Sequence, residues 1–234
     1  MKGVLYGIGL GPGDPELMTL KAYRLIAGAC VIAYPTLEDG ESFARAIAAD
    51  VIPETAQEIP IRIPMTIARA PAQAAYDKGA ADIAVHLDAG RDVVVLCEGD
   101  PFFYGSFMYL FTRLARRYDT EIIPGVTSIT ACAAVAKTPL SARNDVLTIL
   151  PGPLETVEMR TRIESASAVA IMKVGRHLGR IRTMLDAMGL SANATFVARA
   201  SLPLQQVLPL ARAPDPAPYF SMILITKGDA SWLN

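Results

Sequence analysis

The sequence predicts an α/β fold, because unbroken apolar runs alternate with helical patterns and end in turns rich in glycine and proline. Residues 93–97, Val-Val-Val-Leu-Cys, have no polar alternation, which is typical of a strand buried on both faces of a sheet. The run ends at Glu98-Gly99-Asp100-Pro101, where Pro101 prevents the strand from continuing. Most such turns are only connections, but open α/β sheets bind ligands where these turns leave the strands, so this turn is a candidate site.

The first half of the chain alternates strands with helices. Tyr76, Ala80, Ile83 and Leu87 form one helical face, and Gly90 follows as a C-cap. A short extended piece at 59–63 lies between prolines, which predicts an edge strand or a loop. The remaining strands are expected at 4–10, 30–34, 93–97 and 121–123, and the remaining helices begin at 16, 42 and 107.

The second half repeats the alternation. Strands are expected at 146–150, 169–172, 195–199 and 220–226, and helices at 126–136, 154–165 and 176–188. The division into two α/β domains is placed in the segment 117–124, which gives domains of residues 1–119 and 120–234.

Composition excludes several classes of protein. The 234 residues are 52% hydrophobic and 19% charged, with a net charge of −1, so neither disorder nor general attraction to nucleic acid or membranes is expected. No apolar stretch reaches bilayer length and no signal-peptide core is present, which predicts a cytoplasmic protein. Cys30, Cys97 and Cys132 are expected to be buried free thiols, and with His86 and His177 they make no metal pattern.

The first strand runs into an incomplete dinucleotide fingerprint. Gly9 and Gly11 supply its G-x-G, but Asp14 occupies the third glycine position, where a carboxylate would meet the pyrophosphate. A standard nicotinamide or flavin site is therefore rejected. Thr127 and Ser128 begin the helix after Pro124-Gly125, where they would either present donors to a ligand or only cap the helix.

Four segments in this order and spacing resemble the tetrapyrrole methylases, the S-adenosylmethionine-dependent methyltransferases of corrinoid and sirohaem synthesis: GIGLGPGDPELMTLKA (7–22), CEGDPFFYG (97–105), PGVTSIT (124–130) and YFSMILI (219–225). The resemblance is strongest to members that methylate C20 of precorrin-2 or its cobalt form. That likeness rests on Glu98 and on the segments FFYGSFMYLFTRL (102–114) and AIMKVGRHLGRIR (170–182).

The resemblance implies two α/β domains with S-adenosylmethionine in the cleft between them, usually in a homodimer. Matching positions imply that the cofactor is bound by Pro12, Gly99, Asp100, Phe103, Thr127, Ser128, Met172, Ala198 and Ser221. A proton must leave C20 after methyl transfer, and Glu98 is the candidate base or partner of the cation, with Asp14 as the alternative. A cap or salt-bridge role for Glu98 is equally open.

The carboxylates of a tetrapyrrole call for arginine. Arg143 is the first candidate, and Tyr104 is placed to stack on the macrocycle; further candidates are Arg62, Arg176, Arg69, Arg113 and Arg180. The alternatives are a methylase of the same superfamily acting at another ring carbon, on rRNA or on diphthamide, and a non-catalytic protein that binds S-adenosylmethionine. A nucleic-acid substrate would favour a basic excess that this chain lacks.

Overall fold

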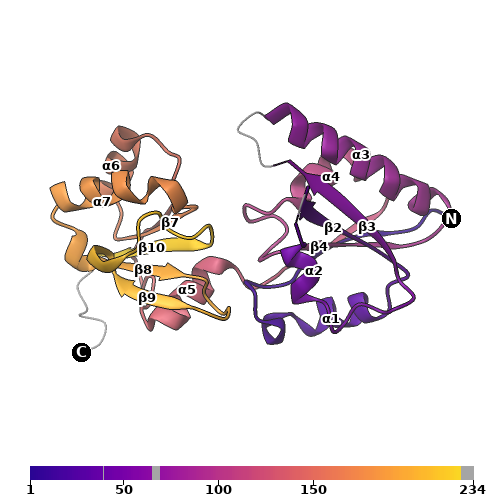
Figure 1. Cartoon of the computed structure of the whole chain (residues 1–234), viewed down its shortest axis with the longest axis horizontal. Coiled ribbons are helices and arrows are strands. Elements are labelled where there is room, and N and C mark those ends of the chain that lie inside the picture. The colour runs from indigo at the N-terminus through magenta and orange to yellow at the C-terminus, as the bar shows by residue number, and fades with distance from the viewer. Residues whose placement is uncertain (39, 65–68, 228–234) are drawn as a thin grey trace. The chain divides into compact units, whose positions relative to one another are not determined.

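The computed structural model describes residues 1–38, 40–64 and 69–227, and the chain divides into two compact units, Met1–Thr127 and Ser128–Asn234 (Figure 1). Within the described residues each unit contains one five-stranded sheet with helices, so the expected α/β fold is confirmed. No described helix has both the length and the apolar character that a membrane span requires.

The first unit is built on a parallel sheet of order β3-β2-β4-β1-β5. Its strands are β1 Leu5–Gly9, β2 Val31–Leu37, β3 Gln57–Ile63, β4 Val93–Cys97 and β5 Thr120–Ile123. Its helices are α1 Leu20–Ala27, α2 Phe43–Ile47, α3 Arg69–Asp88 and α4 Phe107–Leu114, with a 3-10 turn at Pro15–Leu17. All five residues of β4 are buried, as its unbroken apolar run predicts.

Helices cover both faces of this sheet (Figure 1). Val93 and Val95 pack with α3 and α4, whereas Val94 and Leu96 pack with α1 and α2. Because successive side chains of a strand point to opposite faces, β4 contributes to both cores, and its carboxyl end is held rigidly from both sides.

Two details of this unit correct the sequence analysis. β2 continues through Pro35 to Leu37, because it pairs with the edge strand β3 along its whole length. Cys30 is exposed rather than buried, because it precedes β2 in the turn after α1; Cys97 and Cys132 are buried as expected.

The second unit has a mixed sheet of order β6-β7-β10-β8-β9, in which only β6 and β7 are parallel among the described pairs. Its strands are β6 Leu147–Pro151, β7 Ala168–Met172, β8 Ala194–Ala198, β9 Gln206–Pro209 and β10 Ser221–Thr226, and its α-helices are α5 Ser128–Ala136, α6 Thr156–Ser165 and α7 Leu178–Ala187. The sequence places the domain boundary between residues 119 and 120, whereas β5 pairs with β1 and lies in the first unit.

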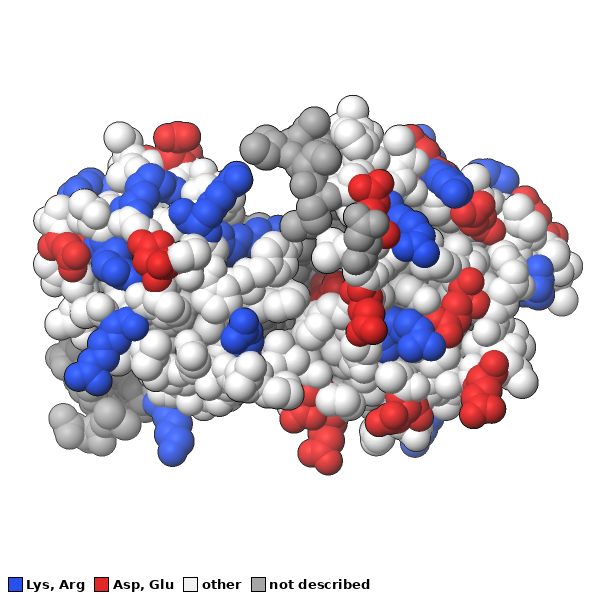
Figure 2. Space-filling model, in the orientation of Figure 1, with Lys and Arg blue, Asp and Glu red and all other residues white. Residues whose placement is uncertain are grey.

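The two units carry opposite net charge. Residues 1–127 contain 11 Lys and Arg against 16 Asp and Glu, a net charge of −5, whereas residues 128–234 contain 11 against 7, a net charge of +4. Figure 2 shows the same asymmetry on one face of each unit. The overall charge of −1 conceals this basic unit, which suits a ligand with several carboxylates.

Candidate functional site

The loops that follow β1 and β4 are joined by their backbones at the carboxyl end of the first sheet. Gly11 donates its N–H to the carbonyl of Gly99 over 3.2 Å, and Gly99 donates to the carbonyl of Gly11 over 2.8 Å. The sheet order also makes β5 a neighbour of β1, so the turn at Gly125 lies at the same end. The three turns that the sequence singled out in this unit therefore meet.

Glycine is required where these turns touch. A Cβ on Gly125 would lie 2.0 Å from the carbonyl oxygen of Gly99, and a Cβ on Gly9 would lie 2.6 Å from the nitrogen of Gly125. Gly99 itself has a φ of +65°, yet its Cβ position meets no atom within 4 Å. The turn thus presents open main chain at Gly99, where a ligand could approach the backbone closely.

Asp100 fastens two of these turns together. Its Oδ1 accepts a hydrogen bond from the N–H of Phe102 at 2.9 Å, and its Oδ2 accepts one from the N–H of Gly125 at 3.1 Å. Both carboxylate oxygens therefore serve the backbone, which gives Asp100 a positioning role. Asp14 likewise caps the 3-10 turn, where its Oδ1 accepts from the N–H of Glu16 at 2.9 Å.

Glu98 is the partly buried carboxyl of this site. Burial raises its pKa above the ordinary value, and backbone N–H groups of Glu98 and Ala44 oppose the shift by hydrogen bonding. Burial also raises the pKa of the Cys97 thiol to about 11 and that of Tyr76 to about 12, so both stay protonated at neutral pH. Of these three groups, Glu98 is the one suited to accept a proton.

The aromatic cluster after the turn has two parts. Phe102 packs against Phe111 and Phe107, with ring centroids 5.0 and 6.1 Å away, and so anchors the loop on α4. Phe103 and Tyr104 pack edge to face at 5.2 Å, and Tyr104 is 42% exposed at a φ of +55°. An exposed tyrosine in a left-handed conformation is suited to contact a ligand rather than the core.

The cofactor positions expected in the second unit's sheet lie at the same end of three inner strands, β7, β10 and β8. Ser221 pairs with Ala198, and the next residue of β10, Met222, pairs with Met172. The hydroxyl of Ser221 donates to the carbonyl of Pro218 at 2.7 Å. The antiparallel register of β10 therefore brings together three positions that are far apart in the sequence. Thr127 and Ser128 are half-buried, and Ser128 is the first residue of α5.

Two cations at this end of the sheet were missed by the sequence analysis. Lys173 directly follows β7 with a φ of +57°, and Arg199 directly follows β8 with a φ of +53°. Left-handed backbone is costly for residues with side chains and is concentrated at functional sites. The available signal was position alone, because each is the first charged residue after a buried strand.

The structure separates the candidate arginines. Arg113 binds Asp77 and Gln73, and Arg180 binds Thr156 and Gly152, so both are engaged in holding the fold. The exposed ones are Arg62 on β3, Arg143 in the loop before β6 and Arg176 in the turn before α7. The side chain of Arg69 lies outside the described residues. In the described parts of the chain no His, Cys, Asp and Glu cluster is suited to a metal.

Comparison with known proteins gives a consistent result. The family model for tetrapyrrole (corrin/porphyrin) methylases matches residues 4–213. The cobalamin biosynthesis protein CobIJ of Mycobacterium tuberculosis is 43% identical over 236 residues, which are 97% of this chain but 46% of that protein. The chain thus spans about half the length of this relative.

Two further relatives are matched along their length. A precorrin-2 C(20)-methyltransferase from Sinorhizobium sp is 40% identical over 232 residues, 95% of each chain. The uroporphyrin-III C-methyltransferase of Thermus thermophilus, solved with S-adenosylhomocysteine, superimposes with a TM-score of 0.68 at 25% identity, covering 99% of this chain and 100% of that one.

Proposed function

Because the chain belongs to the tetrapyrrole (corrin/porphyrin) methylases, we propose that it methylates C20 of precorrin-2, or of its cobalt form, with S-adenosylmethionine as the methyl donor. The observation that carries this proposal is the 40% identity to a precorrin-2 C(20)-methyltransferase over 95% of both chains. Glu98 and the aromatic turn after it, which distinguish this chain within the family resemblance, lie at the carboxyl end of the first sheet.

The open main chain at Gly99 is suited to hold the donor. A ligand there would meet backbone groups of the Gly11 and Gly99 turns, and Asp100 would keep those turns in register. Phe103, Pro12 and Thr127 would complete the first unit's contribution. Ser128, Met172, Ala198 and Ser221 would supply the second unit's contribution.

The chemistry asks the protein mainly to position and to accept a proton. S-adenosylmethionine supplies an electrophilic methyl group, which leaves its sulfur as C20 forms the new carbon–carbon bond. Holding the two reactants in line and free of water is worth about 7–11 kcal/mol of barrier in favourable cases. The proton lost from C20 would pass to the Glu98 carboxylate; Asp14 is the alternative, but it already caps a turn.

The substrate's acetate and propionate arms would be bound by arginine forks. Arg143 and Arg176 belong to the unit with a net charge of +4, and Arg62 belongs to the other unit. Tyr104, exposed beside the turn, would stack on the macrocycle. The protein would work in the cytoplasm as a homodimer, with no nucleic acid or membrane as partner; sedimentation analysis checks the dimer directly.

Incubation with methyl-labelled S-adenosylmethionine and enzymatically made precorrin-2 tests the function. The expected product gains the mass of one methyl group, located at C20 by NMR, and a parallel assay with the cobalt form decides which substrate is preferred. A methyl group at another carbon would support a different tetrapyrrole methylase. Donor binding without any transfer to either tetrapyrrole would support a non-catalytic binding protein.

A further inference from the structure

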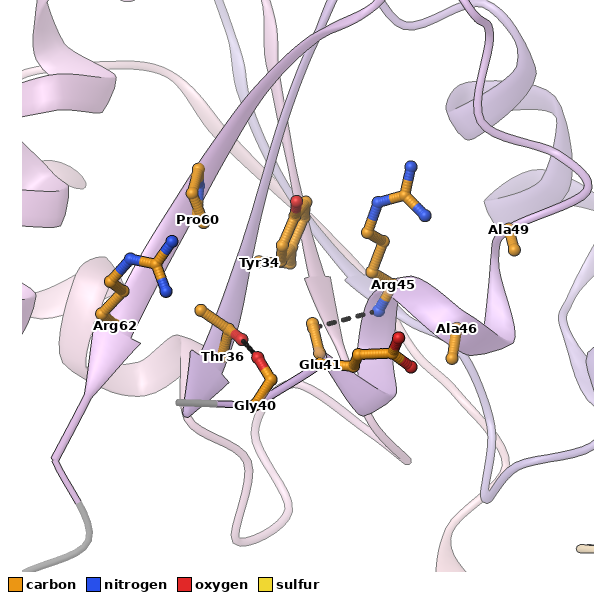
Figure 3. Close-up of a pocket in the computed structure, with 10 residues that line it drawn as sticks. Tyr34, Thr36, Gly40, Glu41, Arg45, Ala46, Ala49, Pro60 and Arg62 are labelled. Carbon is orange, nitrogen blue, oxygen red and sulfur yellow. Dashed lines mark hydrogen bonds between the residues drawn. The ribbon is translucent and has the colours of Figure 1, made fainter. Parts of the chain in front are cut away.

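A polar cavity of about 460 Å³ lies in the first unit, over the carboxyl halves of β2 and β3 and beside α2 (Figure 3). Tyr34 and Thr36 line it from β2, Arg62 from β3 and Arg45 from α2. The turns that meet around Gly99 follow β4, β1 and β5, whereas the cavity lies over β2 and β3 at the other end of the strand order. This cavity is therefore a separate feature of the same sheet end.

The order of the strands relates the cavity to Glu98. Thr36 pairs with Arg62, and Ala33 pairs with Val95 on the other side of β2. The pairing of β2 with β4 stops there and β4 ends at Cys97, so Glu98 lies in the turn that follows β4. The backbone of Ala44 hydrogen-bonds to Glu98, and α2, which contains Ala44, also lines the cavity. Thr36 and Arg62 are thus a cross-strand pair of β2 and β3, and Glu98 follows β4, which is the neighbour of β2 on its other side.

Most polar groups of the cavity are already engaged within the protein. Thr36 donates its hydroxyl to the carbonyl of Gly40 at 2.9 Å. Arg45 forms a fork with the Glu58 carboxylate, with N···O distances of 2.6 and 2.8 Å, so its charge is compensated. These bonds make a rigid wall, and they leave little capacity to bind a further anion.

Arg62 is different. Its Nη1 donates to the backbone carbonyl of Glu38 at 3.1 Å, which orients the guanidinium without neutralising it. Over the part of the chain that the structure describes, no Asp or Glu forms an ion pair with Arg62. In Figure 3 its guanidinium points toward Thr36 and Tyr34, whereas the carboxylate of Glu41 points away from it. Among the described residues, the cavity thus offers one oriented arginine fork that has no acidic partner.

We propose that this cavity receives one peripheral carboxylate of the tetrapyrrole, bound by Arg62, and thereby determines which ring carbon lies at Glu98. The inference rests on the proposed function, since it takes a carboxylated tetrapyrrole as the ligand. When one carboxylate arm is fixed in the cavity, the macrocycle has few orientations in which a ring carbon can reach Glu98. Arg62 would then be a determinant of regiospecificity as well as of affinity.

Three variants test this role: Arg62→Gln, Arg62→Lys and, as a control, Arg116→Gln, which removes an exposed arginine of the turn after α4 and so changes the net charge equally. Arg62→Gln is expected to raise the KM for precorrin-2 about ten-fold or more. Its Kd for S-adenosylhomocysteine should stay within about two-fold of the wild-type value. Its products should include tetrapyrroles methylated at a carbon other than C20. Arg62→Lys keeps the charge but loses the fork, so an intermediate KM is expected. The control should match the wild type.

The outcomes separate this inference from the proposed function. If the wild type methylates C20 and Arg62→Gln keeps its KM and its single product, the inference alone is overturned. If the wild type transfers no methyl group, the proposed function is overturned. The inference is then decided by fluorescence titration with uroporphyrin III, a stable tetrapyrrole with acetate and propionate arms. Weaker binding by Arg62→Gln supports it, and equal binding, or none by the wild type, overturns it.

Discussion

The carboxylate of Asp100 accepts a hydrogen bond from the backbone N–H of Gly125, with an Oδ2···N distance of 3.1 Å. This bond joins the turn after β4 to the turn after β5, across the end of the strand between them. The residue that the family resemblance marks as a cofactor ligand thus has a second task, which is to hold the proposed donor site in shape.

Removing the Asp100 carboxylate should weaken donor binding. Asp100→Ala leaves the N–H groups of Phe102 and Gly125 without their acceptors, which costs about 1–3 kcal/mol for each group kept from water. We expect the Kd for S-adenosylhomocysteine, measured by calorimetry, to rise about ten-fold or more. Asp92→Ala is the control, because Asp92 accepts in the same way from Val4, before β1. If both variants bind equally well, the turn does not depend on Asp100.

Alanine substitutions at Gly125 and Gly99, which contact each other, should affect stability and donor binding differently. Gly125→Ala places a Cβ 2.0 Å from the carbonyl of Gly99, so the backbone must move and the unfolding temperature should fall sharply. Gly99→Ala meets no atom within 4 Å, and its left-handed φ costs only about 1–2 kcal/mol. The added methyl group would instead meet the donor, so Gly99→Ala should remain folded but lose affinity for S-adenosylhomocysteine. Full affinity in folded Gly99→Ala would contradict the proposed donor site.

Glu98 should make stability depend on pH in a defined direction. Burial raises the pKa of Glu98 in the native state above the ordinary value of 4.5. In the pH window between these two pKa values, the native state holds a proton that the unfolded state has lost. The free energy of unfolding therefore falls as pH rises through the window, and Glu98→Gln should escape this loss. Urea titrations of both proteins between pH 4 and 8 measure it; parallel curves would refute the shift.

The same carboxyl gives a kinetic prediction. A base must be ionised, so the wild-type rate should fall as pH drops into the window in which Glu98 takes up its proton. Glu98→Gln should be slower at the pH values where Glu98 is ionised in the wild type, lack this limb of the profile and keep its Kd for S-adenosylhomocysteine. Unaltered turnover would remove Glu98 from the mechanism and leave Asp14 as the candidate.

Local pattern located the buried elements well and the exposed ones poorly. The strand at 93–97 was predicted to the residue, because a strand covered on both faces must be apolar throughout. β9 was not predicted, because Gln206 and Val207 are exposed and only Leu208 packs against the core. Pro35 suggested an end to β2 that the pairing with β3 overrides.

In the candidate site, local sequence patterns identified single residues but not the contacts between them. Motifs identified Gly99 and Asp100, but the contact of Gly99 with Gly125 depends on a strand order that no local pattern specifies. The register of β10 likewise decides that Ser221 faces Ala198. The positive φ at Lys173 and Arg199 could not be predicted from residue type, because glycine is the residue type that indicates a left-handed conformation.

The thiols should react in two classes. Cys30 is exposed, whereas burial raises the pKa of Cys97 to about 11 and that of Cys132 to about 12. Because the thiolate is the reactive form, a disulfide reagent should label one thiol rapidly in the native protein and the other two only after unfolding. Cys30→Ser should abolish the rapid phase. A rapid phase that survives in this variant would show that a buried thiol is accessible.

Replacing Arg199 with glycine should separate function from stability. Its φ of +53° is a strain that glycine relieves, by about 1–2 kcal/mol, against an entropy cost of about 0.5–1 kcal/mol. The unfolding free energy of Arg199→Gly should thus be unchanged or slightly raised, whereas Arg160→Gly, inside helix α6, should lose about 1 kcal/mol. Because Arg199 adjoins Ala198 and carries charge, the variant should nevertheless show a higher KM for precorrin-2. If Arg199→Gly is as unstable as Arg160→Gly and its KM is unchanged, this arginine is held for packing, and the left-handed turn after β8 has no part in binding.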